Sequence, residues 1–129
     1  MENIQVPVSP GEVLDKITIL EIKMECIPAI EKRNNIRHDL NALRQSRKDS
    51  IPDSLPLDRL MTDLKAVNRR LWEIEDDIRD HERDQKFDDR FVTLARAVYK
   101  NNDKRAAIKA EINCLLGASI VEEKSYADY

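Results

Sequence analysis

The feature that most constrains the fold is an apolar seam that repeats every three or four residues through two successive segments. In the first segment the seam consists of Leu57, Leu60, Leu64, Val67, Leu71, Ile74 and Ile78. In the second it consists of Phe91, Leu94, Val98, Asn101, Arg105, Ile108, Ile112 and Leu115. This spacing is that of one face of an α-helix. Because few residues separate the segments, the pattern predicts an antiparallel helical hairpin.

Polar residues interrupt the second seam near its middle. If residues 78 and 91 face each other across the turn, residue 68 meets residue 101 and residue 64 meets residue 105. The predicted polar layer therefore consists of Asn68, Asn101, Asn102 and Arg105. A charged or amide side chain at a seam position costs stability unless it is paired. The layer either fixes the register of the helices or binds an anion. In the first case Arg105 needs a carboxylate, and Asp39 is a geometric possibility if the first helix packs alongside the hairpin.

The remaining segments follow from capping residues and prolines. Residues 9–47 are expected to form a long first helix that starts at Ser9-Pro10 and is kinked at Pro28, or else two successive helices over 10–27 and 29–47. This helix is apolar around so much of its surface that we expect other helices to cover two of its sides. A loop over 48–56 precedes helices over 57–83 and 88–116. Residues 1–8 form an extended arm, and residues 117–129 form a tail after Gly117.

Composition agrees with one all-α domain of 129 residues, in which 36% of the residues are charged and only 2 are glycine. We expect a coiled-coil-like bundle of three to four helices, with the long first helix packed on the hairpin. The net charge of −3 gives no bulk attraction to nucleic acid or to a membrane. The start of the chain lacks the basic and apolar regions of a signal peptide, and no apolar run is long enough to span a bilayer. These features predict a cytoplasmic protein.

Opposite charges are concentrated in two separate segments. Residues 32–48 hold six basic residues against Asp39, whereas residues 73–90 hold nine acidic residues against four basic ones. An antiparallel homodimer would bring the two segments together. The single tryptophan, Trp72, lies at the edge of the seam, where it either packs in the bundle or anchors an interface. Because the basic segment has no aromatic residue for base stacking, nucleic-acid binding is not expected.

Two catalytic alternatives remain open from the sequence. Carboxylate pairs on facing helices could hold Mg²⁺ as in helical nucleotide pyrophosphohydrolases, and the candidates are Glu21, Glu25, Glu73 and Asp76. A chorismate-mutase-like site would instead clamp a dicarboxylate without a metal, and its candidates are Arg79, Arg96 and Arg105. The acidic spacings are also those of an ordinary solvated helix. No phosphate-binding glycine loop and no nucleophile with a neighbouring base is found. We therefore expect a non-catalytic interaction or assembly module without a cofactor.

Several runs resemble a family of small, uncharacterised bacterial helical proteins. They are Val6-Pro7-Val8-Ser9-Pro10-Gly11-Glu12 with the following Leu14 to Lys23, Leu71 to Arg79, Ala95 to Tyr99, Asn102-Asp103, and Glu122 to Tyr126. The resemblance spans nearly the whole chain. It implies an independent helical domain of bacterial origin, and it brings no catalytic residue with it.

Overall fold

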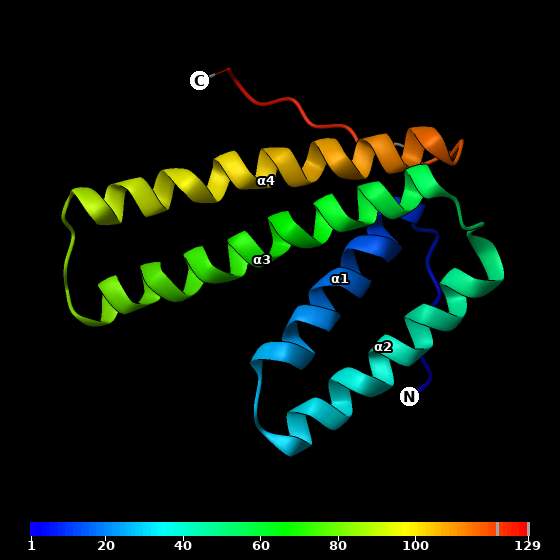
Figure 1. Cartoon of the computed structure of the whole chain (residues 1–129), viewed down its shortest axis with the longest axis horizontal. Coiled ribbons are helices and arrows are strands. Elements are labelled where there is room, and N and C mark those ends of the chain that lie inside the picture. Colours follow the sequence, from blue (N-terminus) through cyan, green and yellow to red (C-terminus); the bar gives the residue numbers. More distant parts are fainter. Residues whose placement is uncertain (121, 129) are drawn as a thin grey trace.

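The computed structural model describes residues 1–120 and 122–128, and within these residues the chain forms four α-helices and no strand. The helices are α1 (Pro10–Cys26), α2 (Ile30–Ser50), α3 (Leu55–Arg83) and α4 (Asp89–Leu115). They form two antiparallel hairpins, α1–α2 and α3–α4, which meet at one end and diverge toward their turns (Figure 1). The predicted all-α class and the second hairpin are confirmed.

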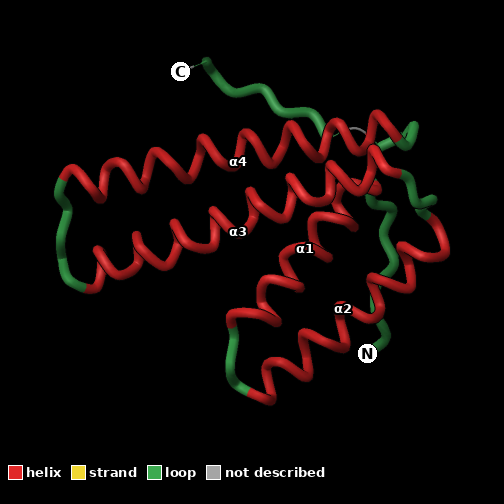
Figure 2. The backbone as a smooth tube through the Cα atoms, in the orientation of Figure 1, coloured by secondary structure: helices red, strands yellow, loops and turns green. Residues whose placement is uncertain are grey.

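The break at Pro28 separates two helices instead of kinking one. The predicted continuous helix over 9–47 is therefore wrong, and the alternative of two successive helices is correct. However, α2 continues to Ser50, three residues into the expected loop over 48–56. Ile27 and Ala29 have extended backbone, with ψ angles of 117° and 122°. For Ile27 the reason is that proline disfavours a helical residue before it. The side chain of Arg33 donates hydrogen bonds to the carbonyls of Met24 and Ile27 at the end of α1. The chain can thus reverse, and α2 packs back against α1 (Figure 2).

The other two connections follow local capping. Ser54 Oγ accepts a hydrogen bond from the backbone N–H of Leu57 at 3.2 Å, so α3 begins two residues earlier than expected. Asp88 Oδ1 caps α4 by accepting from the N–H of Phe91 at 3.0 Å. Gln85, with a φ of 55°, reverses the chain between α3 and α4. The predicted helices over 57–83 and 88–116 thus match α3 and α4 to within two residues at each end.

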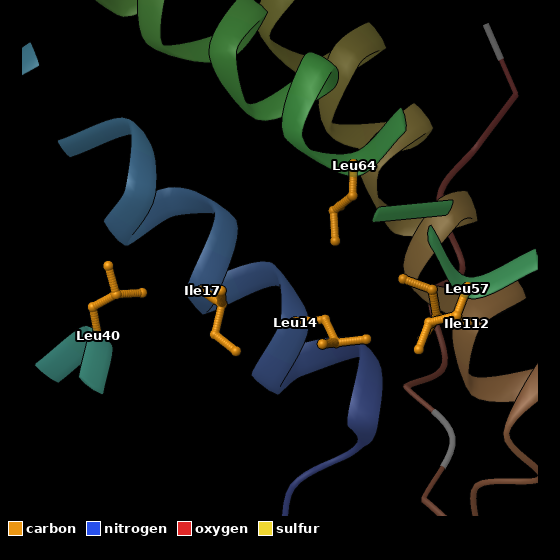
Figure 3. Packing of buried hydrophobic residues seen from close by; sticks show 6 residues of the cluster. All are labelled: Leu14, Ile17, Leu40, Leu57, Leu64 and Ile112. Carbon is orange, nitrogen blue, oxygen red and sulfur yellow. The ribbon is translucent and has the colours of Figure 1, made fainter. Parts of the chain in front are cut away.

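The hydrophobic core lies where the two hairpins meet, around α1. This helix packs against each of the other three, so the expectation that it is covered on more than one side is confirmed. The central cluster, drawn in Figure 3, consists of Leu14, Ile17, Leu40, Leu57, Leu64 and Ile112. Burial of each such side chain contributes about 1.5–3 kcal/mol. We call this region, where α1 packs on the first half of α3 and the second half of α4, the junction.

Close packing of α1 on α4 at the junction depends on Gly11. Its N–H donates a hydrogen bond of 2.8 Å to Asn113 Oδ1. A Cβ atom at this position would lie 2.8 Å from the carbonyl oxygen of Lys109 and 2.9 Å from Asn113 Oδ1. Any side chain would therefore push the start of α1 away from α4.

Away from the junction, the α3–α4 hairpin continues as a two-helix projection. Ile74 and Leu94 are its outermost buried residues, and no residue from 75 to 93 is buried. Phe87 and Val92 are half exposed there. We call this part, residues 75–93, the tip. Among the described residues, no helix is long and apolar enough to cross a membrane.

Candidate functional site

A buried carboxylate at the junction organises the polar residues of the bundle. Asp15 lies on the covered side of α1 and is 0% exposed. Arg105 of α4 donates from Nε to Asp15 Oδ1 at 2.9 Å and from its terminal nitrogen to Oδ2. A guanidinium and a carboxylate joined by two parallel hydrogen bonds form a strong and directional pair. Because this bond stabilises the charged form, it raises the pKa of Arg105 against the opposing effect of burial.

Asn68 and Thr18 complete the cluster. Asn68 Nδ2 donates to Asp15 Oδ1 at 2.9 Å and to Thr18 Oγ1 at 2.8 Å. The Thr18 hydroxyl in turn donates to the backbone carbonyl of Asp15 at 2.8 Å. We call these four residues, from α1, α3 and α4, the Asp15 cluster. The hydrogen bonds of the cluster join three helices and so fix their relative positions.

Lys109 lies one turn beyond Arg105 on α4. It links the start of α1 and the C-terminal tail to the Asp15 cluster. Its ammonium group lies 2.6 Å from Glu12 Oε2, 3.3 Å from Glu122 Oε2 and 3.9 Å from Asp15 Oδ2. Burial alone lowers the pKa of Lys109, but the hydrogen bond with Glu12 and the three carboxylate charges outweigh it, so the pKa is raised. Glu122 also accepts a bond of 3.3 Å from Ser9 Oγ, which joins the tail to the start of α1.

The predicted polar layer is only partly assembled. Asn68 and Arg105 meet as predicted, but through Asp15 and not through each other. Asn101 lies outside the cluster and donates to the carbonyl of Ala97 in its own helix at 2.8 Å. Asn102 lies beside Arg105 in the lining of two surface clefts. The possible partner Asp39 does not pair with Arg105: it is exposed on α2, and Asp15 of α1 supplies the carboxylate instead.

Trp72 lines a cleft of about 460 Å³ where α1, α3 and α4 meet. Ile19, Leu71 and Val98 form its apolar wall, and its polar lining consists of Asn68, Glu75, Asp76, Arg79, Asn102 and Arg105. We call it the Trp72 cleft. Two of the three arginines of the dicarboxylate-clamp hypothesis therefore line one cleft. The third, Arg96, is exposed on α4 and is not part of the lining.

The first pair of predicted metal-binding carboxylates is engaged by basic residues. Glu21 pairs with Arg44 at 3.0 Å and with Lys65 at 3.8 Å. Glu25 pairs with Arg69 and, at 3.2 Å, with Lys65. The hydrogen bond from Arg69, followed by that from Lys65, lowers the pKa of Glu25. The pair with Arg44 joins α1 to α2, and the pairs with Lys65 and Arg69 join α1 to α3.

The second pair of carboxylates does not converge on the first. Glu73 is exposed and pairs with Arg70 at 3.6 Å. Asp76 makes no ion pair with any described residue and lines the Trp72 cleft. Within residues 1–120 and 122–128, no group of three or more histidines, cysteines or acids could hold a metal ion.

A comparison with family models decides the relationship of the chain. The model of a family of unknown function, DUF6165, matches residues 4–129. The chain belongs to this family. The comparison with curated proteins finds no match, and the comparison with solved structures finds none either. The resemblance inferred from the sequence is thus confirmed as membership of an uncharacterised family.

The DUF6165 chain carries functional groups at the junction that the sequence interpretation missed. Asp15, Thr18 and Lys109 were not among the candidates. The signal for Asp15 was weak, because α1 also carries Glu12, Glu21 and Glu25, which are not buried. Periodicity could not identify the partner, because that depends on how α1 crosses the α3–α4 hairpin.

Proposed function

We propose that this DUF6165 protein is a non-catalytic helical assembly module that forms a homodimer. In this dimer the outer face of α2 in one copy contacts the tip of the α3–α4 hairpin in the other. The observation that carries the proposal is a set of unpaired opposite charges on two parts of the molecule that lie far apart within one copy (Figure 1).

The outer face of α2 is basic and partly apolar. Ile30, Arg37 and Lys48 are separated by seven and eleven residues, which places them on one side of the helix. Ile30 is 76% exposed. Neither Arg37 nor Lys48 makes an ion pair with a described residue, whereas Arg44 on the same helix is paired with Glu21. Two cations and an apolar side chain are thus available to a partner.

The tip has the complementary character. Glu82, Asp84 and Asp89 surround the turn between α3 and α4, and none of them makes an ion pair with a described residue. Phe87 and Val92 beside them are 54% and 52% exposed. Charge complementarity selects the partner and its orientation, while burial of the apolar side chains supplies affinity. The Asp15 cluster also supports the proposal. Asp15 balances the charge of Arg105 inside the chain, so Arg105 does not need an anionic ligand.

Light scattering at low and high salt tests the dimer. We expect twice the mass of one chain at low salt, and partial dissociation at high salt because exposed charges are screened. A mass of one chain under both conditions would contradict the proposal.

Charge reversal tests the contact itself. We expect Arg37→Glu/Lys48→Glu and Glu82→Lys/Asp84→Lys each to form monomers alone, because like charges then face each other. A mixture of the two variants should restore the dimer. The control for the first variant is Lys104→Glu/Lys124→Glu, which makes the same change in net charge as Arg37→Glu/Lys48→Glu at exposed positions elsewhere and should remain dimeric. If the mixture stays monomeric while the control dimerises, the two surfaces do not contact each other.

A further inference from the structure

We propose that the Trp72 cleft binds a small organic amine with an apolar body. This proposal concerns one copy of the chain and does not depend on the proposed dimer. It rests on the orientation of a buried amide, on the charge balance of the cleft, and on the apolar wall.

The orientation of the Asn68 amide follows from its partners. A carboxylate paired with an arginine only accepts hydrogen bonds, so the amide atom that contacts Asp15 is Nδ2, in agreement with the bonds to Asp15 and Thr18. The other amide atom, Oδ1, accepts no hydrogen bond from any described residue. Asn68 itself is 5% exposed. A nearly buried residue therefore keeps one unused acceptor.

This acceptor opens onto the Trp72 cleft. Among the described residues, every fully buried side-chain nitrogen and oxygen has a hydrogen-bond partner. The unpartnered Oδ1 must therefore reach open space, and Asn68 is one of the residues that line the Trp72 cleft. An occupant of the cleft would gain a hydrogen bond by donating an N–H or O–H to this oxygen.

The charges in the cleft favour a cation over an anion. Both arginines in the lining are already balanced, Arg105 by Asp15 and Arg79 by Glu75 at 3.1 Å. The remaining charge is the carboxylate of Asp76, which has no ion-pair partner among the described residues. An ammonium group carries positive charge and donates up to three hydrogen bonds. A tryptophan is also the side chain whose ring face attracts a cation most strongly.

The apolar wall determines the rest of the ligand. Ile19, Leu71 and Val98 line the same hollow, and its volume of about 460 Å³ is in the range of small-molecule sites. A compact hydrocarbon body on the amine would cover these side chains. The ligand class is therefore a primary amine attached to a small aliphatic or aromatic ring.

Fluorescence of Trp72, the only tryptophan in the chain, reports directly on the cleft. Three probes with the same ring separate a site for a cation from one for a neutral or an anionic group. They are cyclohexylmethylamine, cyclohexylmethanol and cyclohexanecarboxylate. We expect a saturable change of emission with the amine, and binding at least ~10-fold weaker with the alcohol and the carboxylate, as for a hydrogen-bonded charge. If the carboxylate binds as tightly as the amine, or no probe changes the emission at millimolar concentration, the proposal is overturned.

Substitutions at two exposed residues of the cleft should change the affinity for the amine in opposite directions. Asp76→Asn removes the unpaired carboxylate and should weaken amine binding by ~5-fold or more. Arg79→Gln removes a positive charge from the lining and should strengthen amine binding, whereas it would weaken an anion site. Glu82→Gln is the control for Asp76→Asn. It removes one negative charge from the same helix outside the cleft and should leave amine binding unchanged. A loss of amine binding in Arg79→Gln, or equal effects of Asp76→Asn and Glu82→Gln, would refute the assignment.

Discussion

The two ends of the α3–α4 hairpin carry the same sequence pattern and yet have different physical properties. At the junction, Leu57, Leu64 and Ile112 are completely buried because α1 covers the hairpin. At the tip, Ile78 and Phe91 occupy the same seam but are only half-buried. The spacing of apolar residues therefore reports that two helices touch. It does not report how deeply a third element buries their contact.

The ion pairs at the junction and at the tip differ even more than the apolar residues do. Arg105 at the junction bonds to a carboxylate that is 0% exposed, whereas Arg79 bonds to an exposed carboxylate one turn away on its own helix. Both arginines make an ion pair. If Arg105 is removed, Asp15 stays buried away from water, whereas Glu75 is exposed to water whether or not Arg79 is present. The energy of a pair thus depends on its surroundings more than on its geometry.

The largest effect is expected for Arg105→Met. The substitution removes the guanidinium that is hydrogen-bonded to the buried Asp15 carboxylate and leaves only Lys109, 3.9 Å away, which costs about 3–5 kcal/mol. The measurement is the free energy of unfolding from urea denaturation monitored by circular dichroism. The variant should unfold at a much lower urea concentration than the wild type.

A double variant separates the cost of the stranded charge from the value of the pair. Asp15→Asn/Arg105→Met removes both charges and keeps an oxygen that can accept from Asn68. We expect it to recover most of the lost stability, because neutral pairs of similar volume often replace buried ion pairs without penalty. Should the double variant be no more stable than Arg105→Met, the cost would lie in lost packing of the arginine stem.

The sequence allowed prediction of the helices, because their signals are local. Ser9, Asp88 and Gly117 mark helix ends by capping, and the seam marks the hairpin that places Asn68 near Arg105. The identity of the carboxylate between them was not predictable in this way. Asp39 and Asp15 are both acidic residues of the first half of the chain, and only the reversal at Pro28 decides that α1, and not α2, lies against α4.

A second experiment uses the raised pKa of Lys109 to distinguish the junction from the surface. A lysine whose pKa is raised on folding stabilises the protein fully below its ordinary value of 10.5, and this contribution is lost as the pH rises through the folded-state value. The stability of the wild type should therefore fall in the window above pH 10.5. In Lys109→Met this alkaline loss should be smaller, and stability at neutral pH should be lower because three carboxylates each lose one nearby cation.

The control for this experiment is Lys104→Met, on the same helix. Lys104 is exposed and makes no ion pair with a described residue, so its variant should keep the alkaline slope of the wild type. Parallel pH profiles for Lys109→Met and the wild type would show that the contacts of Lys109 with Glu12 and Glu122 do not contribute to stability.

The smallest effect is expected at the tip end of α3, for Arg79→Gln. The pair with Glu75 spans one helical turn, and the two side chains are 76% and 48% exposed. Water solvates both groups in the folded and unfolded states, so the loss of unfolding free energy should be about 0.3–0.5 kcal/mol. Urea denaturation under the conditions used for Arg105→Met makes the two values comparable. If the loss of unfolding free energy in Arg79→Gln approached that in Arg105→Met, the tip would be covered in solution. If a second copy provides this cover, the stability of the protein would also depend on protein concentration.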